Sequence, residues 1–162
     1  MSVQVASKDR ELTITRMFDA PPELVFEVWT SCEHLKHWWG PKEWPMVECR
    51  LDFQEGGEWH FCLRGPNDGD ESWGKAIYKE IREPKKIVYE DYFSDKDGKI
   101  NNQMPGMLIT VAFIAQDGKT KQINTTRFET SEMRKKIEEM GVVEGMSSSM
   151  DRLDEYLAKI QE

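Results

Sequence analysis

The chain has 162 residues, about the length of one domain, and 30 acidic residues against 22 basic ones give it a net charge of -8. An acidic surface repels phosphate backbones and anionic lipid, so the charge argues against nucleic acid and membrane surfaces as partners. The longest uncharged stretch, residues 100–116, is shorter than the about 20 apolar residues that a membrane-spanning helix needs.

The cysteines indicate a reducing compartment. Cys32, Cys49 and Cys62 are odd in number and form no C-x-x-C pair, which predicts buried free thiols rather than a disulfide framework. The first residues lack the basic-then-apolar order of a signal peptide. We therefore expect one cytoplasmic domain over residues 1–162.

The first third of the chain predicts one strand and two short helices. Alternation of apolar and polar residues over Glu11–Phe18 is typical of a strand. Proline and an acidic residue at 21–23, followed by apolar residues three and four apart, predict a short helix near 24–29. Ser31 can cap a second helix over Glu33–Trp39, which Gly40 and Pro41 would end.

The middle of the chain alternates with period two, which predicts consecutive strands joined by hairpin-length turns. Asp117 and Gly118 are typical of a tight hairpin turn. The strands are expected at Met46–Phe53, Glu58–Leu63, Ser72–Ile81, Lys86–Phe93, Met107–Ala115 and Thr120–Phe128.

The C-terminal part is predicted to be helical because its apolar residues recur every three and four positions. One helix precedes Gly141, and a second, over Val142–Ile160, would be about 28 Å long at 1.5 Å per residue. Antiparallel strands followed by a long helix predict an α+β fold. We expect a curved antiparallel sheet of about six to seven strands, with two short helices after the first strand and the long helix packed across the sheet.

Several motifs over about residues 10–160 resemble one family. They are Arg16-x-Phe18-x-Ala20-Pro21-x-Glu23-x-Val25-Phe26-x-x-Trp29, His34-Leu35-x-x-Trp38-Trp39-Gly40-Pro41, Gly56-Gly57-x-Trp59-x-Phe61, Tyr78-x-Glu80-Ile81 and Met150-Asp151-Arg152-Leu153-x-x-Tyr156-Leu157. In this order they resemble the stand-alone domains named for the activator of the heat-shock protein ninety ATPase, within the START-like (SRPBCC) helix-grip superfamily. The resemblance implies the helix-grip fold. It also implies either an apolar small molecule, such as a lipid, a hormone or a polyketide, held in the grip, or a chaperone partner.

Aromatic residues and methionines are the candidates for lining such a cavity, because small-molecule sites have apolar walls with a few polar groups. The same residues can instead fill the core, and that alternative stays open. Many relatives carry Trp at the position of Met146, so the pocket wall here is expected to be wider or softer. Met104, Met107 and Met140 are also expected near the pocket. The ligand-binding candidates are Trp38, Trp39, Trp59, Phe61, Trp73, Tyr89, Asp91, Phe93, Phe128, Met146 and Met150.

Asp91 is the one candidate with acid–base chemistry. Alternation along its strand places it on the same side as Tyr89 and Phe93, and a carboxylate inside an apolar cavity would have a raised pKa. Tyr89, Asp91 and Arg127 are expected to orient a ligand. Three functions follow in order: binding of a hydrophobic or aromatic small molecule, a chaperone-interacting module that uses its outer surface, and a polyketide cyclase-like or hydrolase-like enzyme.

No cofactor, metal, nucleic acid or inserted membrane segment is expected as a partner. His34 and His37 lie three residues apart, but no H-E-x-x-H motif or cysteine pair supplies further metal ligands, so an exposed helix face is favoured. The sequence has no G-x-S-x-G motif, and the serines at 147–149 fall in the middle of a helix, where hydroxyls bond the backbone or face solvent.

Overall fold

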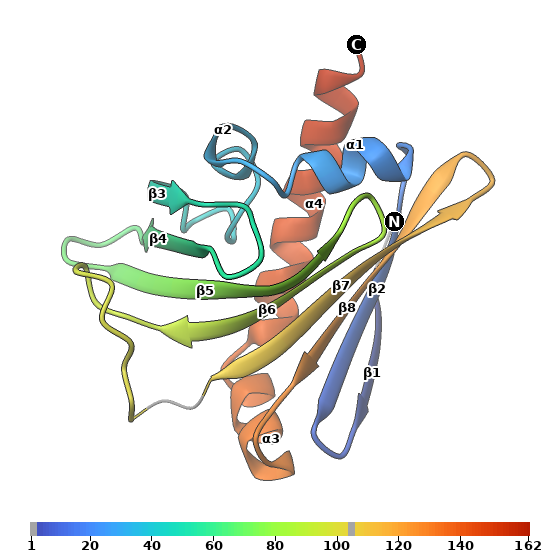
Figure 1. Ribbon diagram of the computed structural model, residues 1–162. Helices are drawn as coiled ribbons and strands as arrows, with labels where there is room; N and C mark the ends of the chain where they lie inside the picture. Colours follow the sequence, from blue (N-terminus) through green and yellow to red (C-terminus); the bar gives the residue numbers. More distant parts are fainter. Residues whose placement is uncertain (1–2, 104–105) are drawn as a thin grey trace.

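A computed structural model describes residues 3–103 and 106–162 of the chain. It contains an eight-stranded antiparallel sheet and four helices (Figure 1). The strands are β1 Gln4–Lys8, β2 Glu11–Phe18, β3 Met46–Leu51, β4 Glu58–Arg64, β5 Glu71–Arg82, β6 Lys86–Phe93, β7 Met107–Gln116 and β8 Lys119–Arg127. The helices are α1 Pro22–Glu27, α2 Cys32–Leu35, α3 Ser131–Glu139 and α4 Val142–Ile160.

The α+β class, the curved sheet and the long C-terminal helix are confirmed, but the sheet has eight strands rather than six to seven. The additional strand is β1, which pairs only with β2 at the edge of the sheet. All five of its residues are exposed, so it carries no alternation of buried and exposed positions from which a strand could be predicted.

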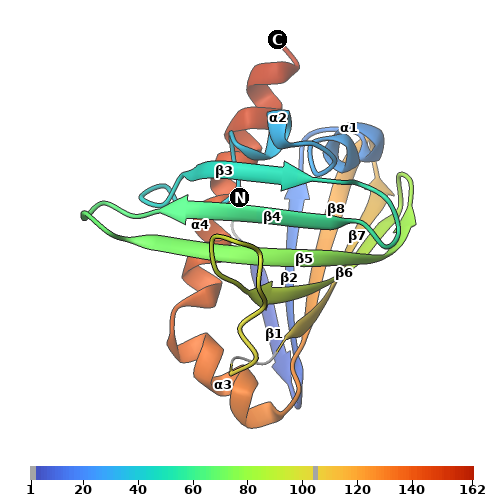
Figure 2. The ribbon, with the colours of Figure 1, turned by 60° about the vertical axis from the view of Figure 1, so that its left-hand side comes forward.

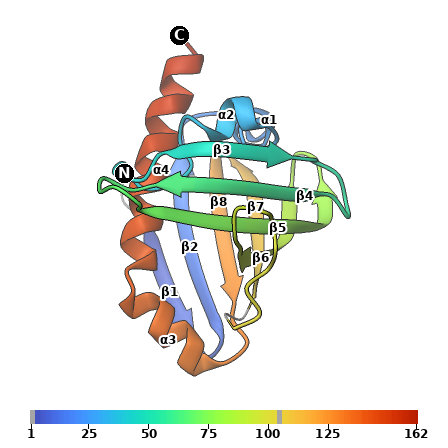
Figure 3. The same ribbon diagram turned by 90° about the vertical axis from the view of Figure 1, so that its left-hand side faces the viewer.

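The sheet bends so that β3, β4 and β5 run nearly across β2 and β8, as Figures 2 and 3 show. Its order is β1-β2-β8-β7-β6-β5-β4-β3. The helix α4 packs along one side of this bent sheet, which we call the inner face, and α1 and α2 cover one end. Met150, Leu153 and Leu157 of α4 are buried against the inner face, as the spacing of the apolar residues predicted.

The short helices form where their local signals predict them. The N-terminal proline of α1 fits the first helical turn, where its missing N–H is not needed. The Ser31 hydroxyl accepts a hydrogen bond from the backbone N–H of His34 and so caps α2. That helix ends at Leu35, earlier than the predicted Trp39, and Trp38 lies in the core, where its indole N–H donates to the carbonyl of Val28.

No described helix is long and apolar enough to cross a membrane.

Candidate functional site

The inner face of the sheet carries the candidate site. Side chains alternate along each strand, so residues paired across neighbouring strands share a face. Trp59 of β4 pairs with Ala76 of β5, and Ala76 pairs with Asp91 of β6. Because Trp59 and Ala76 are buried on the inner face, Asp91 also lies on that face. The inward position predicted for Asp91 from its strand is confirmed.

Four aromatic residues form what we call the inner cluster: Trp39, Trp59, Phe61 and Tyr89. The ring of Trp59 lies at its centre, with ring centroids 4.7 Å from Trp39, 4.6 Å from Phe61 and 6.5 Å from Tyr89. Gly74 allows this packing, because a Cβ there would lie 2.5 Å from Cζ of Phe61. The sequence candidates from the α2 region, β4 and β6 are therefore brought together.

Trp59 differs from the other buried tryptophans in its polar atom. Its side chain is 1 % exposed, and among the described residues its indole N–H has no hydrogen-bond partner. Trp38 donates to the Val28 carbonyl and Trp29 donates to the Gln122 side chain. A buried donor without an acceptor costs about 1–3 kcal/mol. The unpaired N–H thus distinguishes Trp59 from Trp29 and Trp38.

Asp91 lies in surroundings that disfavour its charge. Desolvation raises the pKa of its carboxyl from 3.8 to about 7, against a smaller opposing effect of a hydrogen bond from the Tyr92 backbone. In the part of the chain that the structure describes, no cationic side chain forms an ion pair with it. Burial, and then the nearby Asp91, raise the pKa of Tyr89 as well. The site therefore holds a carboxyl that changes protonation near neutral pH.

Half-buried inward side chains lie beside Asp91. Phe93 follows it along β6, Met107 pairs with it from β7, and both are half-buried. Met146 of α4 is half-buried too, and it packs against both the main core and a second cluster. Half-buried side chains at inward positions show where the inner face is incompletely covered by the protein itself.

Trp38, Met150 and Phe128 are placed in the core. Trp38 and Met150 belong to the main core. The sulfur of Met150 accepts a hydrogen bond from the Gln122 amide. Phe128 lies just beyond β8, in the second cluster with Leu12 and Ile137, so the structure does not bring it to Trp59.

Trp73 and Arg127 lie outside the candidate site. Trp73 pairs with Cys62 on the outer face of the sheet, where its ring stacks on His60 at 5.0 Å and its N–H donates to Glu71. The expectation that Trp73 points into the grip is wrong. Ala76 and Tyr78 occupy buried, inward positions of β5, and Trp73 lies an odd number of residues from both, so its side chain is on the opposite face. Arg127 is exposed, since the inward positions at that end of β8 belong to Asn124 and Thr126.

Met140, likewise expected near the pocket, is 64 % exposed. It terminates α3 instead of starting the inner stripe of α4. Met104 lies outside the described residues.

The serines of α4 bind backbone groups of the segment that carries Trp39, a role that sequence reasoning left unspecified. Ser149 donates to the carbonyl of Trp38, and the Ser148 hydroxyl accepts from the N–H of Lys42. Arg152 adds hydrogen bonds to the carbonyls of His37, Trp39 and Gly40. The helix thereby fixes the segment that holds one wall of the inner cluster.

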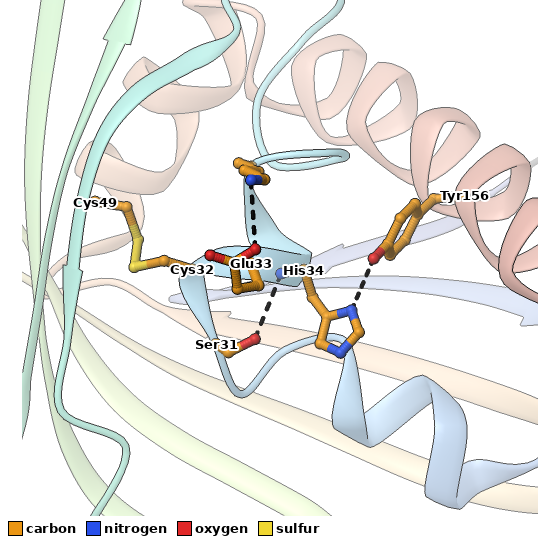
Figure 4. Close-up of polar contacts among 7 residues, drawn as sticks. Ser31, Cys32, Glu33, His34, Cys49 and Tyr156 are labelled. Carbon is orange, nitrogen blue, oxygen red and sulfur yellow. Dashed lines mark hydrogen bonds and ion pairs between the residues drawn. A yellow bond between two sulfur atoms is a disulfide. The ribbon is translucent and has the colours of Figure 1, made fainter.

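The two histidines of the α2 region contact Tyr156 of α4. Nδ1 of His34 lies 2.8 Å from the Tyr156 hydroxyl (Figure 4), and the ring of His37 stacks on the tyrosine at 4.9 Å. Desolvation and the neighbouring Lys36 lower the pKa of His37. Within residues 3–103 and 106–162, no group of three or more His, Cys, Asp or Glu side chains is arranged to hold a metal ion.

Cys32 and Cys49 form a disulfide between α2 and β3 (Figure 4), with Cα atoms 5.8 Å apart. The prediction of three free thiols is therefore wrong. The argument for a reducing compartment, which was based on the absence of a disulfide, no longer holds. Only Cys62 is free and buried, which confirms the expectation for that residue. Sequence reasoning missed the pair because the residues are 17 positions apart, on elements that only the tertiary fold brings together.

Comparison with known proteins gives a family match over most of the chain. The model of a family described as Activator of Hsp90 ATPase homolog 1-like protein matches residues 19–158. A search of curated proteins found no relative that matches.

Several solved structures share the fold over nearly their whole length. A solution structure from Arthrobacter aurescens has 27 % identity and a TM-score of 0.90, and the alignment covers 98 % of this chain and 93 % of the other. A crystal structure from Mycobacterium smegmatis has 27 % identity and a TM-score of 0.86, covering 97 % and 96 %. A solution structure from Staphylococcus epidermidis has 29 % identity and a TM-score of 0.84, covering 98 % and 96 %.

Proposed function

The chain belongs to the Activator of Hsp90 ATPase homolog 1-like family, and we propose that it binds a hydrophobic or aromatic small molecule between the inner face of the sheet and α4. The observation that carries this proposal is the inner cluster with its unpaired Trp59 N–H, next to half-buried inward residues around Asp91. Apolar walls with a few polar groups are the usual composition of small-molecule sites.

The hydrophobic effect supplies most of the affinity. Burying about 300 Å² of ligand surface at roughly 25 cal/mol per Å² contributes about 7 kcal/mol before ordering costs, so an affinity in the micromolar range or weaker is expected. Trp39, Trp59 and Phe93 would contact the rings of such a ligand, with Met146 as an adaptable wall.

The test is a fluorescence titration with N-phenyl-1-naphthylamine, an uncharged probe whose emission rises in apolar surroundings. The wild type is expected to bind it, and Met146→Trp, which adds bulk between the two clusters, is expected to weaken binding about tenfold. Met140→Trp is the matched control, because Met140 is largely exposed and should leave binding unchanged. Absence of binding, or equal binding by the wild type and Met146→Trp, would contradict the proposal. Either result would favour the alternative of a chaperone partner that binds the outer surface.

Proton transfer on the bound molecule is a second candidate function, favoured by Asp91 alone. A carboxyl with a pKa of about 7 can both donate and accept a proton at neutral pH. Loss of turnover in Asp91→Asn with unchanged binding of a substrate would support this activity, and full turnover in that variant would exclude Asp91 as its acid or base.

A further inference from the structure

The outer face of the sheet carries a group of basic and aromatic residues that the proposed function does not use. Arg50 of β3 pairs with His60 of β4, and His60 pairs with Lys75 of β5, so the three side chains share one face. That face is the outer one, because His60 follows the inward Trp59 along β4. Trp73 lies on the same face, with its ring stacked on His60 at 5.0 Å.

The segment that follows β6 folds back over this face and passes in front of β5 in Figure 3. Nε2 of His60 lies 2.9 Å from the carbonyl oxygen of Asp95, and the Lys75 ammonium donates to the carbonyl of Gly98 at 3.0 Å. The Asp95 carboxylate accepts hydrogen bonds from two backbone N–H groups of the same segment, which fixes the turn. The segment therefore forms a wall above β4 and β5.

A hollow of about 320 Å³ lies between this wall and β3, and we call it the outer hollow. Its volume is within the range of small-molecule sites, about 300–1,000 Å³. Its charged and aromatic lining residues are Glu48, Arg50, His60, Trp73 and Lys96.

The outer hollow has an excess of positive charge in a chain whose net charge is -8. Among the described residues, Arg50 and Lys96 form no ion pair, and the carboxylate of Glu48 is the one acidic group that lines the hollow with them. The neighbouring hollow differs, because three carboxylates line it and one of them pairs with Lys75. Those carboxylates belong to Asp52, Glu58 and Asp97. An anion is therefore favoured in the outer hollow and disfavoured in its neighbour.

Trp73 gives the outer hollow a fixed aromatic surface. Its ring is nearly parallel to that of His60, at an interplanar angle of 25°, and its indole N–H donates to Glu71 at 3.3 Å. Glu71 is in turn paired with Arg64. Contacts on two sides thus hold the half-buried indole in one orientation, and a flat ring can pack against it.

We propose that the outer hollow binds a small aromatic carboxylate, whose charged group lies between Arg50 and Lys96 and whose ring packs against Trp73. A guanidinium can donate two parallel hydrogen bonds to one carboxylate, and the Lys96 ammonium adds a second positive charge. An uncharged aromatic compound would use only the Trp73 surface, and an ammonium ligand would be repelled by both cations. This site lies on the opposite face of the sheet from the proposed function and is independent of it.

The experiment is an NMR titration of the ¹⁵N-labelled protein with 2-naphthoate at low ionic strength and neutral pH. Binding is expected to shift the indole N–H signal of Trp73, which Trp73→Phe identifies, and to leave that of Trp59 in place. The same titration is made with 2-naphthamide, which is uncharged, with 2-(aminomethyl)naphthalene, which is a cation, and with decahydro-2-naphthoate, which lacks the aromatic ring. The naphthoate is expected to bind about tenfold more tightly than the amide or the amine, and several-fold more tightly than the saturated acid.

Variants assign the effect to the charges of the outer hollow. Arg50→Gln should weaken naphthoate binding several-fold, and Glu48→Gln should strengthen it several-fold, because it removes the like charge. Lys135→Gln, which removes one exposed positive charge on α3, is the matched control and should leave binding unchanged.

Three results would overturn this inference: no shift of the Trp73 signal with any ligand, binding of the amide or the amine as tight as that of the naphthoate, or equal affinity of the wild type and Arg50→Gln. Shifts confined to the Trp59 signal would also overturn it, because they would place the naphthoate on the inner face, and they would leave the proposed function standing.

Discussion

Single residues set the polar character of the inner face. The chain has six tryptophans, and the three compared in the core, Trp29, Trp38 and Trp59, differ in whether the indole N–H has a partner. Arg16 and Asp91 differ among the charged side chains, because α4 supplies two carboxylates to Arg16, whereas Asp91 forms no ion pair with a described residue. A buried polar group without a partner costs stability.

Asp91 is expected to make the free protein less stable as the pH rises. Its carboxyl has a pKa of about 7 in the folded state against 3.8 as the ordinary value, so between these pH values the folded state binds the proton more tightly. That contribution is complete below about pH 4 and is lost as the pH rises to 7. Asp91→Asn has no such dependence, so relative to the wild type it should gain about 2.5 kcal/mol of unfolding free energy between pH 5 and pH 8.

Urea unfolding of both proteins at the two pH values measures this difference. Comparing the two proteins at each pH cancels the other titrating groups. Asp97→Asn, which removes an exposed carboxyl on a turn outside the sheet, is the matched control. Parallel pH dependence of Asp91→Asn and the wild type would show that Asp91 titrates normally.

At the scale of elements, α4 does more than cover the sheet. Its apolar stripe buries Met150, Leu153 and Leu157, while its polar residues bind the backbone of the segment between α2 and β3. That segment has little regular structure to satisfy its own carbonyls. The helix thus holds Trp39 in the inner cluster through hydrogen bonds made beside its packing surface.

Arg152→Ala should therefore destabilise the protein by about 2 kcal/mol, because a charged donor is lost from the carbonyls of His37, Trp39 and Gly40. Thermal or urea unfolding measures the change. Lys159→Ala, an exposed cation on the same helix, is the matched control and should stay within about 0.5 kcal/mol of the wild type. Equal stability of the two variants would mean that α4 fixes this segment by packing alone.

At the scale of the whole molecule, the disulfide is the covalent tie between the helical end and the sheet. Cys32 belongs to α2 and Cys49 to β3, an edge strand that pairs only with β4. A cross-link of this kind reduces the conformational freedom of the unfolded chain. The sheet edge and the wall of the inner cluster near Trp39 are thereby held as one body.

Replacing both Cys32 and Cys49 with serine is expected to lower the unfolding free energy by about 3 kcal/mol, the value for a loop of about this length. Cys62→Ser, which leaves the disulfide intact, is the control for cysteine replacement. Counting thiols in the denatured, unreduced protein gives an independent answer: one free thiol is expected from Cys62, and three would show that the bond is absent.

Much of the fold was predictable because its signals are local. The positions of β2, β6 and α4 follow from period two or from spacings of three and four, and the Ser31 cap follows from one side chain and a backbone N–H three residues away. The same alternation placed Asp91 on the inner face. It would also have placed Trp73 on the outer face, had Ala76 and Tyr78 been used to set the inward positions of β5.

The sequence by itself determined the order and type of most elements, the long helix and the family. Helices and strands can be predicted in this way because their periods appear in the spacing of apolar residues that are close together in the chain. Tertiary structure alone decided the Cys32–Cys49 pairing, the edge strand β1, the hydrogen bonds of Arg152 and the unpaired state of the Trp59 N–H. Each of these depends on atoms that are distant in sequence and are brought together only when the sheet bends around α4, so no local pattern encodes them.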